Sequence, residues 1–251
     1  MAGKLSIVPT PLGNRGDITL RALEALRAAD VVYAEDTRVT GKLLRSFSID
    51  APLERLDEQV MGQRAEAVAE RVLAGQVAAY CTDAGMPGVS DPGLRLVAAA
   101  RAAGAPVEVL PGPSAAACAY VASGTTCPRY YFGGFFPRKA AEQRACLEGL
   151  RSLDAALVFY ESPNRLVDAL EAIAEVLPLR QVAVCRELTK LHEEVLRGSA
   201  AEVRDAFAQR AGEPGGIRGE VAIVVDAPSQ AEADARYAEA LGAAERMACE
   251  L

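Results

Sequence analysis

The chain of 251 residues contains no tryptophan and only one histidine, His192. A mechanism that relies on a pair of catalytic histidines is therefore excluded, and so is the stacking of a nucleobase on tryptophan. We interpret His192 as a structural residue, because a single histidine beside Glu193 is more often held by a hydrogen bond than used as a base.

Metal-binding patterns and long apolar runs are also missing. The six cysteines are scattered, without a Cys-x-x-Cys pair or a Cys/His cluster, which predicts reduced thiols and no metal site. No apolar segment approaches the roughly 18 residues of a membrane span. The first residues, Met1-Ala2-Gly3-Lys4, lead directly into an expected strand without the core of a signal peptide. We expect a cytoplasmic protein with no membrane partner.

The chain also lacks an excess of positive charge. The formal net charge is −7 and the isoelectric point is near 5.0, which argues against a protein that holds nucleic acid by a general basic surface. A nucleic-acid substrate then requires Lys and Arg side chains that are concentrated at one cleft.

The first half of the chain alternates apolar strands with helices. Strands are predicted at residues 5–9, 31–34, 77–82 and 107–110, and helices at 19–29, 60–74 and 94–103. Strands that are apolar throughout indicate a parallel sheet covered on both faces. We predict a doubly wound α/β domain over residues 1–122, although the length also fits one large α/β domain.

The second half has a different pattern after a segment rich in small and breaker residues at 123–129. Strands are predicted at 130–132, 155–160, 181–186, 193–196 and 220–225, and helices at 142–151, 165–177 and 200–210. Two consecutive strands around Arg186 and Leu196 indicate a partly antiparallel sheet. We predict a mixed α/β domain over 123–228, followed at 229–251 by a terminal helix or a frayed tail.

Three loops that follow predicted strands are rich in glycine and proline. The loop at 83–93 holds three glycines, two prolines and two carboxylates, and similar loops lie at 8–17 and 111–115. Because the carboxyl ends of parallel strands meet at one edge of a sheet, we expect these loops to form one small-molecule site, with Asp83 as a hydrogen-bond acceptor. A long surface turn is the alternative. Neither Gly-x-Gly-x-x-Gly nor a Walker A motif is present, so pyrophosphate cofactors are disfavoured.

The second half adds ionisable and aromatic residues. Strand ends at Tyr160-Glu161 and Arg186-Glu187 place ionisable groups where their pKa values can be tuned; a structural ion pair between Arg186 and Glu187 is the alternative. The loop at 133–139 combines aromatics with two cations, a mix suited to a base and a phosphate, although loop aromatics more often pack. The segment 37–45 carries three cations and is either a solvated helix face or an RNA contact.

Five motifs in this order resemble the tetrapyrrole methylase superfamily of S-adenosylmethionine-dependent methyltransferases, and within it the ribosomal RNA small-subunit methyltransferase I family. The resemblance spans roughly residues 5–226. Its motifs are Thr10-Pro11-Leu12-Gly13-Asn14, Ala34-Glu35-Asp36-Thr37-Arg38, Asp83-Ala84-Gly85, Phe159-Tyr160-Glu161-Ser162-Pro163 and Arg186-Glu187-Leu188-Thr189-Lys190.

The resemblance implies two α/β domains with S-adenosylmethionine bound between them, usually in a homodimer. It also implies 2′-O-methylation of a cytidine ribose in 16S rRNA within the small ribosomal subunit, with S-adenosylhomocysteine as product and no metal. The cofactor-binding residues carried over by position are Leu12, Gly13, Asp83, Gly85, Met86, Pro87, Ser114, Ala115, Tyr160 and Arg186.

For the substrate side, we predict contacts from Arg38, Phe135, Arg138 and Lys139. A ribose hydroxyl is a poor nucleophile near neutral pH, so in-line displacement at the methyl group needs a base or a nearby cation. The candidates for proton handling or charge stabilisation are Glu161, Glu187 and Lys190, and Arg186 is predicted to orient phosphate or ribose. The acidic net charge favours an enzyme that acts on the assembled subunit.

Two departures from the family pattern are visible. Relatives commonly carry a Tyr-His-Glu-His-Asn segment after the third strand, whereas this chain has Leu53-Glu54-Arg55-Leu56-Asp57-Glu58-Gln59, so any contact made by those histidines is absent or replaced. Many relatives also continue into a small helical domain, whereas this chain stops shortly after Ala227, which predicts weaker RNA affinity or a contribution from a dimer partner.

Two alternatives stay open. One is a methyltransferase of the same superfamily that acts on a precorrin ring carbon or a protein side chain, and the other is a non-catalytic S-adenosylmethionine-binding module. The motifs in the second half disfavour both.

Overall fold

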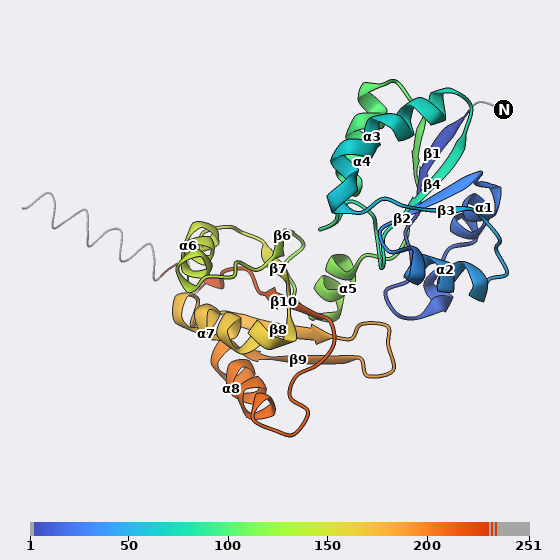
Figure 1. The fold of residues 1–251 in the computed structure, drawn as a ribbon. Coiled ribbons are helices and arrows are strands. Elements are labelled where there is room, and N and C mark those ends of the chain that lie inside the picture. Colours follow the sequence, from blue (N-terminus) through green and yellow to red (C-terminus); the bar gives the residue numbers. More distant parts are fainter. Residues whose placement is uncertain (1–2, 231, 233, 235–251) are drawn as a thin grey trace, which may run out of the picture. The chain divides into compact units, whose positions relative to one another are not determined.

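The computed structural model describes residues 3–230, 232 and 234, and the chain divides into two compact units, Met1–Ala115 and Ala116–Leu251 (Figure 1). The division precedes almost all of helix α5 (Ala115–Ala122), whereas the sequence placed the boundary after residue 122. The reason is packing, because Ala116 and Ala119 are buried among residues of the second unit's sheet, such as Ala156 and Val158. Helix α5 therefore belongs with the second unit.

The sheet of the first unit is parallel throughout, with the strand order β3-β2-β4-β1-β5, which confirms the predicted fold class. Its strands are β1 (Lys4–Ile7), β2 (Val31–Ala34), β3 (Leu53–Arg55), β4 (Val77–Cys81) and β5 (Val107–Val109). The sequence did not predict β3. This strand has three residues, none of them buried, and only one of them, Leu53, is apolar, so no apolar run marks it in the sequence.

Helices cover both faces of this sheet (Figure 1). They are α1 (Leu20–Ala28), α2 (Thr37–Ser46), α3 (Glu58–Leu73) and α4 (Gly93–Ala102). Met61 of α3 and Leu96 of α4 share one buried cluster with Tyr33 and Tyr80 of the sheet. The cluster on the opposite face contains residues of α1 and α2. Strands buried on both sides explain the continuous apolar runs in the sequence.

The second unit contains a mixed sheet with the order β6-β7-β10-β8-β9, as predicted. Its strands are β6 (Tyr130–Phe135), β7 (Ala156–Glu161), β8 (Gln181–Arg186), β9 (Glu194–Ser199) and β10 (Val221–Val225). Strands β6 and β7 are parallel, and the other pairs are antiparallel. Helices α6 (Ala140–Leu150), α7 (Leu166–Val176) and α8 (Ala200–Ala211) pack on one face, and α5 packs on the other.

None of the helices within the described residues is both long enough and apolar enough to span a membrane.

A buried ion pair joins the second sheet to the segment that follows it. The Arg180 guanidinium is 1% exposed and donates to both carboxylate oxygens of Glu232, at 2.6 and 3.0 Å. It also donates to the carbonyl oxygens of Asp226 (2.8 Å) and Arg151 (2.7 Å). The predicted terminal segment 229–251 lies mostly outside the described residues, but Glu232 belongs to it, and its carboxylate is held by Arg180.

We expect Glu232→Ala to lower the free energy of unfolding by about 3–5 kcal/mol, because it leaves the Arg180 cation buried without its counter-charge. Asp234→Ala is the matched control, since Asp234 is exposed and hydrogen-bonds only Gln230 among the described contacts. Urea unfolding followed by circular dichroism measures both variants. Equal stability of the two variants would contradict the role assigned to the pair.

Candidate functional site

Two backbone hydrogen bonds tie the loop after β1 to the loop after β4. Thr10 and Gly85 exchange N–H···O bonds of 3.0 Å in both directions, and the Thr10 hydroxyl donates to the carbonyl oxygen of Thr82 at 3.2 Å. Gly85 has a φ of +79°, and a Cβ there would lie 3.1 Å from Leu12 Cδ2 and 3.7 Å from the carbonyl oxygen of Pro113. The loops after β1, β4 and β5 therefore meet at one place, as the parallel topology predicts.

The predicted cofactor residues of the first unit lie on these three loops. Gly85 and Pro87 are buried, Asp83 and Gly13 are exposed, and the remaining ones are half-buried. The half-buried ones are Leu12, Met86, Ser114 and Ala115. The predicted residues Tyr160 and Arg186 lie at the ends of β7 and β8 in the second unit.

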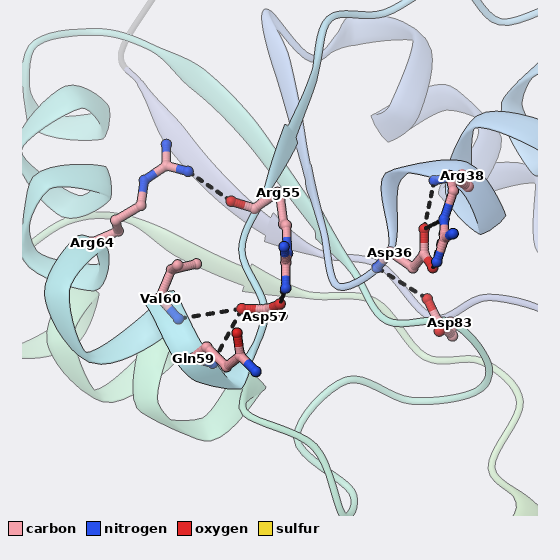
Figure 2. A network of polar contacts seen from close by, with 8 residues as sticks. All are labelled: Asp36, Arg38, Arg55, Asp57, Gln59, Val60, Arg64 and Asp83. Carbon is pink, nitrogen blue, oxygen red and sulfur yellow. Dashed lines mark hydrogen bonds and ion pairs between the residues drawn. The ribbon is translucent and has the colours of Figure 1, made fainter.

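Carboxylates gather at the ends of β2 and β4 (Figure 2). The amide of Asp36 donates to Asp83 Oδ1 at 3.1 Å. Burial raises the pKa of Asp83, and the nearby Asp36 carboxylate raises it further. Burial likewise raises the pKa of Glu35, with added repulsion from Asp83 and Asp91, whereas hydrogen bonds from Arg38 hold the pKa of Asp36 well below its usual range. Asp83 and Glu35 thus bind protons more readily than ordinary carboxylates.

Two cavities of the first unit adjoin these carboxylates. A cavity of about 300 Å³, which we call the α2 pocket, is lined by Thr10, Pro11, Gly13, Arg15, Val39, Thr40, Lys42, Leu43, Ser46, Thr82 and Asp83. A second cavity of about 590 Å³ is lined by Glu35, Asp36, Thr37, Arg38, Arg55, Asp57, Glu58 and Gln59. Arg38, a predicted substrate contact, lies in the second cavity, where its exposed side chain pairs with Asp36 (Figure 2).

Glu161 is enclosed within the second unit. Its side chain is 0% exposed, Oε1 accepts a hydrogen bond from the Ser162 amide at 2.6 Å, and the same oxygen pairs with Arg165. Burial raises its pKa against the opposing effect of these partners. Neither oxygen is open to solvent, and Oε2 has no hydrogen-bond partner among the described residues. Glu161 is thus paired with Arg165 through one oxygen, and its role in proton handling stays a prediction.

Glu187 and Lys190 form a compact ion-pair cluster after β8. Lys190 Nζ lies 2.8 Å from Glu187 Oε1 and 3.0 Å from Glu220 Oε2, and the Glu220 amide also donates to Glu187 at 2.9 Å. Hydrogen bonds from Lys190 and from the Glu220 amide lower the pKa of Glu187. Burial lowers the pKa of Lys190, but its hydrogen bonds to the two glutamates outweigh burial and leave the pKa raised. Glu187 is therefore a weak base and Lys190 a fixed cation.

Arg186 pairs with Glu194 and with a backbone carbonyl, and not with Glu187, the partner considered as an alternative in the sequence. Its Nε donates to Glu194 Oε2 at 3.1 Å, and its Nη1 donates to the carbonyl oxygen of Arg218 at 3.0 Å. The side chain is 22% exposed. One edge of the guanidinium thus remains partly accessible at the end of β8.

An aromatic surface lies at the end of β6 and β7. Phe135 is 60% exposed and meets Tyr160 edge-on at 5.7 Å between ring centroids, and Phe132 meets the same ring at 4.8 Å. Phe136, one residue further, is buried against Phe159. The predicted substrate residues Arg138 and Lys139 follow in an exposed turn, where Lys139 pairs with Glu142. We call Phe132, Phe135 and Tyr160 the aromatic ledge.

Comparisons with known proteins show the family and the fold of this chain. Residues 4–204 match the family model of Tetrapyrrole (Corrin/Porphyrin) Methylases. The chain is 43% identical over 233 residues to a ribosomal RNA small subunit methyltransferase I of Micromonospora olivasterospora, covering 93% of this chain and 73% of the relative. The corresponding relative from Escherichia coli O157:H7 is 42% identical, with coverage of 92% and 80%.

The chain belongs to the ribosomal RNA small subunit methyltransferase I family. This family lies within the tetrapyrrole methylases, and the chain is a methyltransferase. Among solved structures, a diphthine synthase superposes with a TM-score of 0.68 at 16% identity, covering 89% of this chain and 90% of that chain. A uroporphyrin-III-C-methyltransferase from Thermus thermophilus superposes with a TM-score of 0.60 at 22% identity, covering 94% of this chain and 98% of that chain. These two likenesses show the fold alone.

The segment that lacks the histidines of the ribosomal RNA small subunit methyltransferase I pattern has a structural role in this member. Leu53–Arg55 forms β3, and Asp57 caps α3 by accepting from the amides of Gln59 (3.1 Å) and Val60 (3.2 Å). Asp57 also pairs with Arg55, whose carbonyl oxygen accepts from Arg64 at 2.6 Å (Figure 2). Arg55 is thus a cation in the larger cavity that sequence reasoning did not single out.

The sequence did not identify some residues that line the α2 pocket of this family member, because no motif in their neighbourhood indicates a binding role. Thr40, Thr82 and Lys42 come together only when α2 packs beside the loops after β1 and β4. Lys42 belonged to a cation-rich segment whose role stayed open, and the two threonines gave no signal.

The Glu187 cluster predicts a pH dependence of stability. Because the pKa of Glu187 lies below its ordinary value of 4.5 in the folded state, its contribution is fully present above that pH and is lost as pH falls through the folded-state pKa. We expect Glu187→Gln to reduce stability at pH 7 by about 1–3 kcal/mol and to flatten the acid limb of a stability–pH curve. Denaturant unfolding from pH 7 to pH 3 measures this; a parental slope in the variant would refute it.

Proposed function

We propose that this methyltransferase transfers the methyl group of S-adenosylmethionine to the 2′-hydroxyl of a cytidine ribose in 16S rRNA. The observation that carries the proposal is the junction of the loops after β1, β4 and β5, locked by the Thr10–Gly85 bridge. This junction lies in a chain whose relatives at 39–43% identity are named as ribosomal RNA small subunit methyltransferases. The acidic net charge of −7 favours the assembled small subunit over free RNA as substrate.

The residues at the loop junction fit S-adenosylmethionine. Gly85 has no side chain and a backbone conformation that lets the loop pass close to a ligand. The exposed carboxylate of Asp83 suits the hydroxyl or ammonium donors of the cofactor, and the half-buried Leu12 and Met86 suit its apolar edges. When bound, the cofactor supplies a methyl group on a sulfonium, which is an activated donor.

The second unit offers groups that suit an RNA nucleotide. The aromatic ledge presents Phe135 as a stacking surface for a base, and the Tyr160 ring contacts Phe135 edge-on. Arg186 and Lys190 hold positive charge that stabilises an oxyanion or a phosphate. The weak basicity of Glu187 makes it a partner that orients Lys190 rather than a proton acceptor.

Positioning carries most of the proposed catalysis. The donor is already activated, so holding the ribose oxygen in line with the methyl group removes the largest part of the barrier. The hydrogen bonds of the loop junction and of the Glu187–Lys190 cluster restrain the groups that the proposal uses, which is what such positioning requires. Assembly as a homodimer stays a prediction of the family resemblance, and a cytoplasmic location stays a prediction from the sequence.

Labelled S-adenosylmethionine tests the reaction. We expect the protein to label small subunits from cells that lack the corresponding enzyme, with the methyl group mapped to the 2′-oxygen of one cytidine. Transfer to naked 16S rRNA should be slower. No incorporation, or a methyl group on a base, would refute the proposed reaction, and equal rates on naked rRNA would refute the requirement for the subunit.

The aromatic ledge makes a separate prediction. We expect Phe135→Ala to raise KM for small subunits roughly five- to hundredfold, because base–aromatic stacking contributes about 1–3 kcal/mol. Leu179→Ala is the matched control, since Leu179 is a large apolar residue of the same unit with a similar exposure, 63% against 60%. Steady-state methyl transfer measures both variants; a KM for Phe135→Ala equal to that of the control would remove the ledge from the substrate site.

A further inference from the structure

The α2 pocket places Asp83, which the proposed function assigns to the cofactor, beside features that the proposed reaction has not used. Its mouth carries the exposed cations Arg15 and Lys42, and its wall includes the Asp83 carboxylate. Apolar side chains of α2, such as Val39 and Leu43, complete the lining. The volume of about 300 Å³ is at the lower end of the range for small-ligand sites.

Two buried hydroxyls line this pocket without a hydrogen-bond partner. Thr40 is 1% exposed and Thr82 is 3% exposed, and the Oγ1 atom of each has no partner among the described residues. The other hydroxyls of the pocket are satisfied, because Thr10 donates to the Thr82 carbonyl and Ser46 donates to the Leu43 carbonyl. Buried polar atoms are rarely left unpaired, so two in one pocket point to a ligand that pairs with them.

The polar groups of the pocket define that ligand. Two cations and two hydroxyl donors match the oxygens of a phosphate. The Asp83 carboxylate would repel a free phosphate, but it accepts a hydrogen bond from a sugar hydroxyl, and its amide partner Asp36 holds it in place at 3.1 Å. A ligand with a phosphate at one end and a hydroxyl at the other satisfies both.

We propose that the α2 pocket binds one ribose–phosphate unit of the RNA substrate, with Lys42 and Arg15 at the phosphate, Thr40 and Thr82 as hydroxyl partners, and the Asp83 carboxylate shared between the ribose and the cofactor donor that the proposed function assigns to it. This inference rests on the proposed function and names a substrate contact within it. The three cations of α2 then have different surroundings. Arg38 is paired with Asp36 in the other cavity, Lys42 lines the α2 pocket, and Arg45 lines neither cavity.

Charge removal on α2 is the first test. We expect Lys42→Ala to raise KM for small subunits about tenfold, because a hydrogen bond to a charged group is lost. The slope of log affinity against log salt should fall by about 0.7 to 0.9, the value for one lost phosphate contact. Arg45→Ala removes the same charge from the same helix outside the pocket, so its KM should stay near that of the parent.

Hydroxyl removal is the second test. Thr40→Val keeps the shape of the side chain and removes an unpaired buried hydroxyl, so we expect unchanged or higher thermal stability together with a KM for small subunits raised severalfold. The dissociation constant of S-adenosylmethionine, measured by calorimetry, should stay at the parental value in both pocket variants.

Four outcomes overturn the inference. Equal effects of Lys42→Ala and Arg45→Ala would show a general charge effect. Weaker S-adenosylmethionine binding with an unchanged KM for subunits would assign the pocket to the cofactor. Parental KM values in both pocket variants would show that RNA does not use the pocket, while the proposed function would still stand. A parent protein that transfers no methyl group would remove the proposed function and this inference with it.

Discussion

The two hydrogen bonds between Thr10 and Gly85 are the constraint on which the site of the first unit depends. Parallel strands β1 and β4 end at the same edge of the sheet, and both loops must turn there without leaving buried amides unpaired. The bridge pairs these amides with each other, and the positive φ of Gly85 allows the loop to make the turn beside Leu12. Asp83 lies exposed in the second of these loops, two residues before Gly85, and it lines the α2 pocket together with Thr10.

The ionisable clusters are of two kinds. In the first unit, burial raises the pKa values of Asp83 and Glu35, with added repulsion from Asp36 on Asp83 and from Asp83 and Asp91 on Glu35. In the second unit, Glu187 and Lys190 stabilise each other's charged forms, and their pKa values move apart. Glu161 of the second unit belongs with the first kind, because burial raises its pKa as well, so the contrast is between the buried carboxylates and the Glu187–Lys190 pair.

Much of the fold could be predicted from the sequence because the signals were local. Buried strands such as β4 and β10 appear as apolar runs, and the pair β8 and β9 lacks an intervening helix pattern. Strand β3 escaped prediction because its stability comes from pairing with β2, which no residue in Leu53–Arg55 reveals. The division into units lies before α5 rather than after residue 122, because the partners of this alanine-rich helix belong to the second sheet and are distant in the sequence.

By itself the sequence determined the parallel and mixed sheets, the three glycine-rich loops at strand ends and the family to which their motifs point, because these are properties of short contiguous segments. Tertiary structure decided which polar groups have partners within the protein. It pairs Glu161 with Arg165 and Glu187 with Lys190, whereas the buried Thr40 hydroxyl has no partner among the described residues of its pocket, which Lys42 also lines. Burial and partner distance depend on residues far apart in the chain, and only folding brings those residues together.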